Sequence, residues 1–237
     1  MKNVFKNLVV SLAIMGVAQV AHGLSAGPTL SISDGVDPVI IITDNGPGDL
    51  NPGTGELTLS TNVGIWSLSI STGVTTPALG GVTNPVMDLV IQASSTGAGS
   101  LTYTFSDNDF THGPGTLNAA VSGQVISGAP TTVDYSVYGD QGDTVGALTT
   151  LLAPAGTNSL PIVNSTPGAL TFSSQFSLSQ VVQLTASGAS AVSVDTSLNV
   201  TPIPEPSSAG LTFLGLAFLV VGLARRRRSL HCVSYAL

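Results

Sequence analysis

Short stretches with apolar side chains at every second position fill the chain between residues 24 and 201. Examples are TLSIS, ELTLS, MDLVIQA and SLTYTFS, which are also rich in β-branched and aromatic residues. Alternation with a period of two is typical of a strand that buries one face. Between the stretches lie DNGPGDLNPGTG, TNPV, STGAGS, THGPG and NSTPG, whose residue types are typical of turns. No segment of this part keeps a helical period for long.

The pattern predicts an all-β fold, an antiparallel β-sandwich of short strands. The predicted strands comprise residues 29–33, 38–43, 56–60, 63–70, 87–93, 100–106, 131–139, 176–186 and 189–200. We expect one sandwich, and two smaller ones divided near residues 153–161 are the alternative. The predicted core consists of residues 39–42, Trp66, Leu68, Ile70, Leu89, Ile91, Tyr103, Phe105, Val181 and Leu184.

The beginning of the chain has the layout of a secretory signal peptide. Lys2 and Lys6 precede an apolar stretch at residues 8–20, and small residues follow, the last of them Gly23. This order predicts a signal helix that the secretion machinery recognises and that signal peptidase removes after Gly23. Cleavage after Ala26 and a buried N-terminal helix are the alternatives.

The charges of the chain are distributed unevenly. Between residues 7 and 224 there is no Lys or Arg, and every Asp and Glu lies in that interval. The formal net charge of −7 therefore understates how acidic the central part is. Because this part has no cations to displace counterions from phosphate, we do not expect it to bind nucleic acid.

The end of the chain combines a short apolar segment with a block of arginines. Residues 209–224 are apolar except for Thr212 and glycines, and as a helix they would span about 24 Å, close to the thickness of a bilayer's hydrocarbon core. The arginines that follow resist translocation: Arg225, Arg226, Arg227 and Arg228. We therefore expect a transmembrane helix with a cytoplasmic basic end, whereas a core helix of the globular domain is the alternative.

Pro204, Glu205 and Pro206 stand shortly before this apolar segment. The three parts in this order, at residues 202–228, resemble the PEP-CTERM sorting signal of Gram-negative bacteria. The resemblance implies that an exosortase recognises Pro204, Glu205 and Pro206 and cuts nearby. It also implies a transient anchor in the inner membrane, with the arginines as stop-transfer signal, and a final place at the cell surface or outside the cell. Residues 229–237 extend beyond the usual end of this signal.

The exported part offers few candidate catalytic residues. His112 is its only histidine, and the single cysteine, Cys232, follows the arginines. The sequence contains no GxSxG or HExxH motif and no glycine-rich phosphate loop. We therefore expect a protein that is not an enzyme. A hydrolase that combines His112 with Asp107 or Asp109 in a Ser–His–Asp arrangement is the alternative.

Aspartate and asparagine gather in three turn segments, near residues 44–51, 107–109 and 140–143. Carboxylate and amide oxygens are the ligands that Ca²⁺ prefers, which makes Ca²⁺ the candidate cofactor. The predicted metal ligands are Asp44, Asp49, Asp107 and Asp109. The spacing is not that of an EF-hand, and the same residue types are ordinary in turns, so turns without a metal are the alternative.

These features predict an exported protein with a structural or adhesive role in exopolysaccharide or biofilm. Its expected parts are a signal peptide (1–23), an exported β-sandwich domain (24–201), the sorting signal (202–228) and a cytoplasmic tail (229–237). A calcium-dependent carbohydrate-binding module is the first alternative. Separately, Trp66 could stack on a sugar ring, but its strand favours a place in the core. An ice-binding protein is another alternative, because Thr58 with Ser60 and Thr102 with Thr104 resemble outward threonine arrays.

Overall fold

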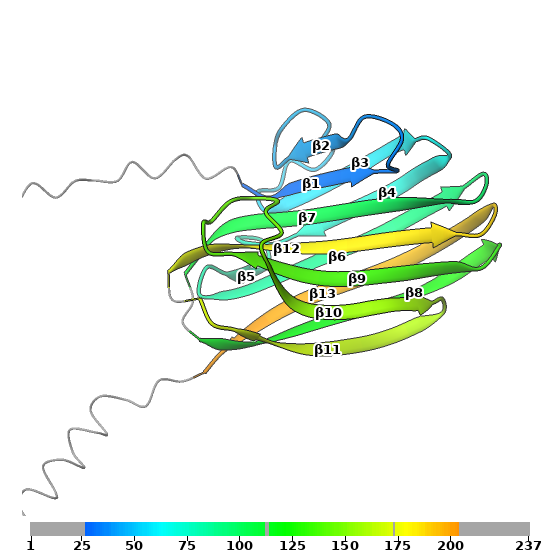
Figure 1. Cartoon of the computed structure of the whole chain (residues 1–237). Helices are drawn as coiled ribbons and strands as arrows, with labels where there is room; N and C mark the ends of the chain where they lie inside the picture. The colour runs from blue at the N-terminus through cyan, green and yellow to red at the C-terminus, as the bar shows by residue number, and fades with distance from the viewer. Residues whose placement is uncertain (1–26, 112–113, 173, 204–237) are drawn as a thin grey trace, which may run out of the picture.

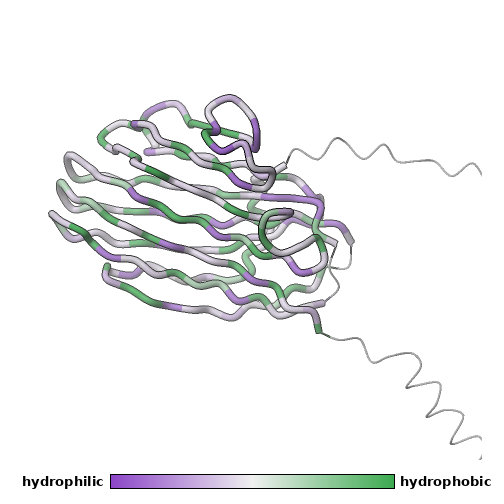
Figure 2. The backbone as a smooth tube through the Cα atoms, turned by 180° about the vertical axis from the view of Figure 1, so that it is seen from behind, coloured by the Kyte–Doolittle hydropathy of each residue, from purple (hydrophilic) through white to green (hydrophobic). Residues whose placement is uncertain are grey.

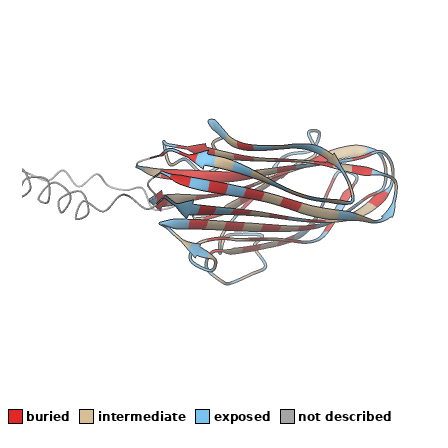
Figure 3. Ribbon diagram, turned by 90° about the horizontal axis from the view of Figure 1, so that it is seen from below, coloured by how far each residue is buried: buried red, intermediate tan, exposed pale blue. Residues whose placement is uncertain are grey.

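The computed structural model describes residues 27–111, 114–172 and 174–203, which form two β-sheets packed face to face (Figure 1, Figure 3). Every strand is antiparallel to its neighbours. The predicted all-β antiparallel sandwich is therefore confirmed. No helix that could cross a membrane occurs in these three ranges. The predicted signal and transmembrane helices lie outside them.

The described chain builds one six-stranded and one seven-stranded sheet. The six-stranded sheet has the order β10 (Thr150–Ser159), β9 (Thr131–Asp140), β12 (Gln175–Ala186), β7 (Gly99–Thr111), β1 (Thr29–Ser33) and β2 (Ile40–Thr43). The seven-stranded sheet has the order β11 (Ile162–Leu170), β8 (Gly115–Gly128), β13 (Ser190–Pro202), β6 (Asn84–Ser95), β4 (Trp66–Val74) and β3 (Glu56–Val63), and the short β5 (Gly80–Gly81) pairs with β6.

The last two strands occupy central positions. β12 lies between β7 and β9, and β13 lies between β6 and β8. From β6 onward the chain crosses between the sheets at every connection except the one from β9 to β10. Both ends of the described chain leave at the same end of the sandwich (Figure 1), which we call the terminal end. The opposite end, where the turn from β10 to β11 lies, is the distal end.

Each predicted strand has a counterpart in the structure, but several strands were missed. β5, β8, β10 and β11 were not predicted, and β8 is 14 residues long, so the expectation of short strands is wrong there. The turn predicted from NSTPG at residues 164–168 is also wrong, because these residues pair with β8 as part of β11. A strand at a sheet edge tolerates proline, which explains Pro167. Strands on both sides of residues 153–161 belong to the same two sheets, so one sandwich is observed.

The core lies between the sheets and consists of alternate residues of each strand. On β9, Val133, Tyr135 and Val137 have no exposed surface, while the residues between them face outward. Figure 2 shows hydrophobic and hydrophilic positions alternating along the strands. Burying each large apolar side chain contributes roughly 1.5–3 kcal/mol, so this alternation stabilises one register of the sheets over a register shifted by one residue.

Most predicted core residues are buried: Ile42, Trp66, Leu68, Leu89, Ile91, Tyr103, Phe105 and Leu184. The prediction is wrong for Val39, Ile41 and Ile70, which are exposed, and Ile40 and Val181 are only partly buried. On β4 a bulge between Leu68 and Ile70 adds one residue and reverses the alternation. Ile70 therefore faces solvent, and Ser71 is buried in its place.

On β12 the polar residue Gln180, next to Val181, points inward. Gln180 is fully buried, and its Oε1 accepts a hydrogen bond from the Tyr135 hydroxyl at 2.7 Å. Val182 is buried as well, so Val181, between these two residues, points to the outer face of the sheet. A buried hydrogen bond therefore takes a position that the sequence pattern assigns to solvent.

Gly73 of β4 provides a test of the packing between the sheets. A Cβ atom at this position would lie 2.7 Å from Phe105 Cε2, and Phe105 is fully buried. Gly73→Ala should therefore lower the free energy of unfolding by about 1–3 kcal/mol through overpacking. Gly97→Ala is the control, because nothing lies within 4 Å of its added Cβ. Chemical denaturation measures both variants, and equal stability would contradict the close approach of Gly73 to Phe105.

Candidate functional site

The terminal end of the sandwich brings together aspartates from three separate segments. Asp107 and Asp109 lie in the last part of β7, so the turn predicted at residues 107–109 is wrong, and Asp143 follows β9. The Asp109 backbone N–H donates to the Asp143 carboxylate at 2.9 Å, and the Asp109 carboxylate accepts a hydrogen bond from Gln175. The charges of Asp44 and Asp109 both act on Asp107. The fold thus places three of the four predicted metal ligands near one another.

Asp107 is almost completely buried at this end, with 4% of its surface exposed. Burial raises the pKa of Asp107 to about 6, and the nearby carboxylates of Asp109 and Asp44 raise it as well. Hydrogen bonds from Thr75 Oγ1 and from the Asn108 N–H, both 2.9 Å long, act in the opposite direction. Asp107 therefore carries a proton in mildly acidic solution.

Asp49, the fourth predicted ligand, organises the loop between β2 and β3. Its carboxylate accepts hydrogen bonds from the backbone N–H groups of Asn45 (3.0 Å), Asn51 (3.0 Å) and Thr58 (2.9 Å). In the same loop, Asp44 Oδ2 accepts another backbone N–H at 3.0 Å, whereas Asp44 Oδ1 is buried without a partner in the described chain. Loop formation alone therefore accounts for the position of Asp49.

No three His, Cys, Asp or Glu side chains of the described ranges are grouped closely enough to hold a metal ion. Ca²⁺ at Asp44, Asp49, Asp107 and Asp109 stays a prediction from the sequence. His112, the candidate catalytic histidine, lies outside the described residues. The sorting-signal residues lie outside them too: Pro204, Glu205, Pro206, Arg225, Arg226, Arg227 and Arg228.

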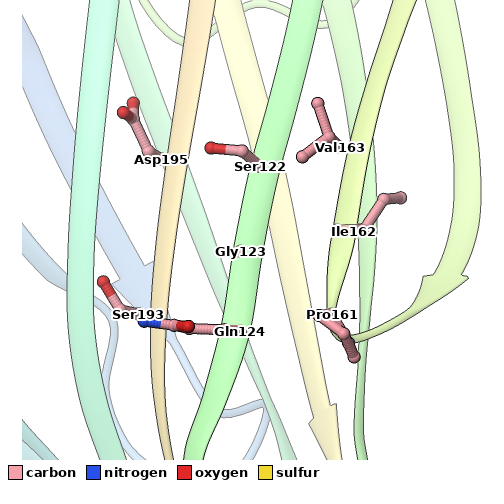
Figure 4. A pocket seen from close by; sticks show the side chains of 8 residues that line it. All are labelled: Ser122, Gly123, Gln124, Pro161, Ile162, Val163, Ser193 and Asp195. Carbon is pink, nitrogen blue, oxygen red and sulfur yellow. The ribbon is translucent and has the colours of Figure 1, made fainter.

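A groove of about 470 Å³ opens on the outer face of the seven-stranded sheet (Figure 4). Its polar lining comes from β8 and β13: Ser122, Gln124, Ser193 and Asp195. Its apolar lining comes from the start of β11 and the turn before it: Pro161, Ile162 and Val163. Val163 is 90% exposed, so the fold leaves this apolar side chain available for contact. The turn at Pro161 places the groove toward the distal end of the sandwich.

The register of the strands aligns the lining residues in rows. Asp195 pairs with Ser122 across β13 and β8, and Ser122 pairs with Val163 across β8 and β11. In the next row Ser193 pairs with Gln124, and Figure 4 shows the Gln124 side chain extending toward Ser193. Directly paired residues on one face lie about 4.5–5.5 Å apart. The groove therefore offers a carboxylate, a hydroxyl and an apolar side chain in one line.

A second carboxyl group adjoins this line. Asp88 lies on β6, the neighbour of β13, and pairs with Ser197, two residues after Asp195. Asp88 and Asp195 are therefore diagonal neighbours on the outer face of the sheet. Burial raises the pKa of Asp88 to about 6, and the nearby carboxylate of Asp195 raises it as well. Asp88 therefore carries a proton in mildly acidic solution and a negative charge at higher pH.

The groove was not predicted from the sequence. β8 and β11, which supply much of its lining, were not among the predicted strands. Asp88 and Asp195 lie in predicted strands, but the strand order that makes them neighbours does not follow from the alternation. One signal was available, because each of these aspartates stands at an outward position between two buried inward residues.

The structure does not place Trp66 where it could stack on a sugar, and it does not arrange the threonines as an ice-binding array. Trp66 is 1% exposed, so its ring packs in the core and is not presented to a sugar. Thr58 lies in the seven-stranded sheet, where its hydroxyl is 3.2 Å from that of Thr72. Thr102 and Thr104 lie in the six-stranded sheet. The threonines singled out from the sequence therefore do not form one flat array.

No protein-family model matches the sequence, and no curated protein matches it. A solved carbohydrate-binding module of the β-sandwich superfamily has 14% sequence identity, with 71% of this chain and 72% of that chain covered and a TM-score of 0.32. A xylan-binding domain from Paenibacillus barcinonensis has 13% identity, coverage of 64% and 88%, and a TM-score of 0.32. A cleaved adhesin domain of Lys-gingipain from Porphyromonas gingivalis has 12% identity, coverage of 64% and 100%, and a TM-score of 0.31. The similarity to these modules is distant and identifies no ligand.

The raised pKa of Asp107 predicts a pH-dependent stability. The unfolded carboxyl has a pKa near 4, so the folded state binds this proton more tightly, and the free energy of unfolding falls as pH rises from about 4 to about 6. Asp107→Asn removes this loss and should raise the free energy of unfolding by about 2 kcal/mol at pH 8, with little change at pH 4. Asp37→Asn, at an exposed position, is the control. Denaturant titrations at both pH values measure the effect, and a stabilisation equal at pH 4 and pH 8 would contradict it.

Proposed function

We propose that this chain is an exported, non-enzymatic β-sandwich module that binds polysaccharide in the groove formed by β8, β11 and β13. The observation that carries the proposal is the groove itself, an open surface with hydrogen-bonding side chains on one side and apolar side chains on the other. Sugars present hydroxyl groups and C–H surfaces side by side, and such a lining can contact both. An adhesive role in exopolysaccharide follows from such binding.

The charge of the chain restricts the polysaccharide. Because no Lys or Arg occurs between residues 7 and 224, the groove has no such cation to pair with a carboxylate or sulfate group of a ligand. An acidic polymer would meet Asp195 in the groove and an acidic protein around it. The proposal therefore favours polysaccharides that are neutral or positively charged.

The position of the groove agrees with display on a cell. The groove lies toward the distal end, whereas residues 27 and 203 leave at the terminal end (Figure 1). If a C-terminal segment is held in a membrane, the groove lies toward the end of the sandwich that is farther from that membrane. The proposal of a surface location thus has two supports. The sequence of residues 202–228 indicates a membrane anchor, and the fold indicates where the groove lies relative to that anchor.

The non-enzymatic part of the proposal draws on the side chains near the groove. The ranges that the structure describes contain no histidine, cysteine, lysine or arginine. Among the residues that line the groove, Asp195 is the only titratable one. A binding site requires only complementary surface, which these residues supply.

Filling the groove should abolish binding. Ser122→Tyr places a large side chain in the middle of the central row, and tyrosine is compatible with a strand. The affinity for the exopolysaccharide of the producing cells should fall at least about tenfold, which corresponds to the loss of about 1.4 kcal/mol of binding free energy. Thr185→Tyr, on the exposed face of the six-stranded sheet, is the control. Calorimetry measures binding, with and without a chelator, and undiminished binding by Ser122→Tyr would contradict the location of the site.

Sorting by an exosortase makes a separate prediction about the C-terminus. We expect protein recovered from the cell surface or the medium to end near residues 204–208, because the Pro-Glu-Pro segment is proposed to direct cleavage. Mass spectrometry of the recovered protein measures the terminus. Replacing Glu205 and Pro206 by alanine should leave uncleaved chains in the membrane fraction. Recovered protein that still carries Arg225 to Arg228 is the result that contradicts cleavage.

A further inference from the structure

The carboxyl pair at the edge of the groove has no counter-charge within the described chain. Asp195 lines the groove, and Asp88 is its diagonal neighbour on the adjacent strand, on the same face of the sheet. The sequence has no Lys or Arg between residues 7 and 224, so neither residue type can neutralise the pair. Two adjacent negative charges on a partly desolvated surface repel each other, and a positive group placed beside them removes that repulsion.

We propose that the groove binds a polysaccharide that carries free amino groups, and that Asp195 and Asp88 together hold an ammonium group of that polymer. This inference rests on the proposed function and narrows its ligand to an amino-sugar polymer. The ammonium group donates its hydrogen bonds to Asp195, which is exposed in the groove. Asp88, on the neighbouring strand β6, adds a second negative charge.

The rest of the central row fits the same sugar unit. Ser122 is the direct neighbour of Asp195 and supplies a hydroxyl that can donate or accept. Val163 is the next residue along the row and supplies an exposed apolar surface. The three strands that carry these residues are about 4.8 Å apart, so the row is about 10 Å wide. A sugar whose ammonium group meets Asp195 therefore lies over Ser122 and Val163.

Protonation of the pair makes the binding dependent on pH. Asp195 on β13 is the charged group that raises the pKa of Asp88, and the charge of Asp88 in turn raises the pKa of the buried Tyr135 hydroxyl on β9. Below pH 6 the pair retains a proton and attracts a cation less strongly. The second charge develops as pH rises through about 6, and the amino groups of a glucosamine polymer lose their protons toward pH 7. The affinity for an amino-sugar polymer should therefore rise from pH 5 to about pH 6 and fall at higher pH.

The test compares two oligosaccharides that differ in one group. Calorimetry at pH 6 and low salt uses the full-length chain in mild detergent with a hexamer of glucosamine and with the hexamer of N-acetylglucosamine. The amino form should bind about tenfold more tightly, because a charge-assisted hydrogen bond replaces a neutral one. Asp195→Asn should remove this preference, and Asp88→Asn should remove its increase from pH 5 to pH 6. Added salt should weaken the preference.

A matched variant controls for the overall loss of charge. Asp134→Asn removes one carboxylate from the six-stranded sheet, where Asp134 accepts a hydrogen bond from Thr157 Oγ1 at 2.7 Å. It should keep the tenfold preference. If Asp134→Asn reduces the preference as much as Asp195→Asn does, the attraction belongs to the net charge of the protein, and the proposed ammonium site is wrong.

The remaining outcomes separate this inference from the proposed function. Equal binding of the two hexamers overturns the inference and leaves a polysaccharide-binding groove. If neither hexamer binds but the exopolysaccharide of the cells does, that polymer is tested before and after chemical N-acetylation, and an unchanged affinity overturns the inference. Loss of binding to every polymer overturns both proposals. A preference that a chelator abolishes identifies a metal ion at the pair and overturns the direct ammonium contact.

Discussion

The absence of lysine and arginine between residues 7 and 224 determines how this protein accommodates its negative charges. A carboxylate in the described chain cannot form an ion pair with either residue type, so neutral donors must stabilise it. Three backbone N–H groups point at Asp49, and the Thr144 N–H and the Thr149 hydroxyl donate to Asp140. The loops at the terminal end therefore provide the donors that surface cations provide in most proteins. Stability has to come from apolar burial between the sheets and from hydrogen bonds.

Apolar burial is also the part of the fold that the sequence encodes most directly. Strands such as β9 alternate strictly, and the alternation alone predicts which side chains enter the core. The bulge on β4 cannot be predicted from the sequence. Leu68 and Ile70 follow the apolar alternation of a regular strand, but the strand has one extra residue between them. β11 was missed for a different reason. Gly168 is needed there because a Cβ atom would lie 2.5 Å from the carbonyl oxygen of Leu152, yet Pro167-Gly168 has the composition of a turn.

The candidate site could not be predicted to the same extent, because it depends on strand order. Ser122, Val163 and Asp195 come from three strands that are well separated along the chain and are joined only by the register of β8 with its two neighbours. Periodicity places each residue on an outer face but does not specify which strands are adjacent. The terminal aspartates were easier to find, since Asp107 and Asp109 form a visible cluster in the sequence. That cluster marks a region rich in hydrogen-bonded loops.

Asp107 and Asp88 show why two aspartates with similarly raised pKa values have different consequences. Both pKa values are raised to about 6, and burial is the main cause in each case. Asp107 is buried beneath the terminal loops, so a proton can reach it but a larger cation cannot. Above pH 6 the negative charge of Asp107 therefore lowers the free energy of unfolding. Asp88 is only partly buried and is the diagonal neighbour of Asp195, which is exposed in an open groove. A larger cation can reach that pair, and its binding offsets the free-energy cost of the negative charge on Asp88. For this reason we assign a ligand to the groove and not to the terminal end.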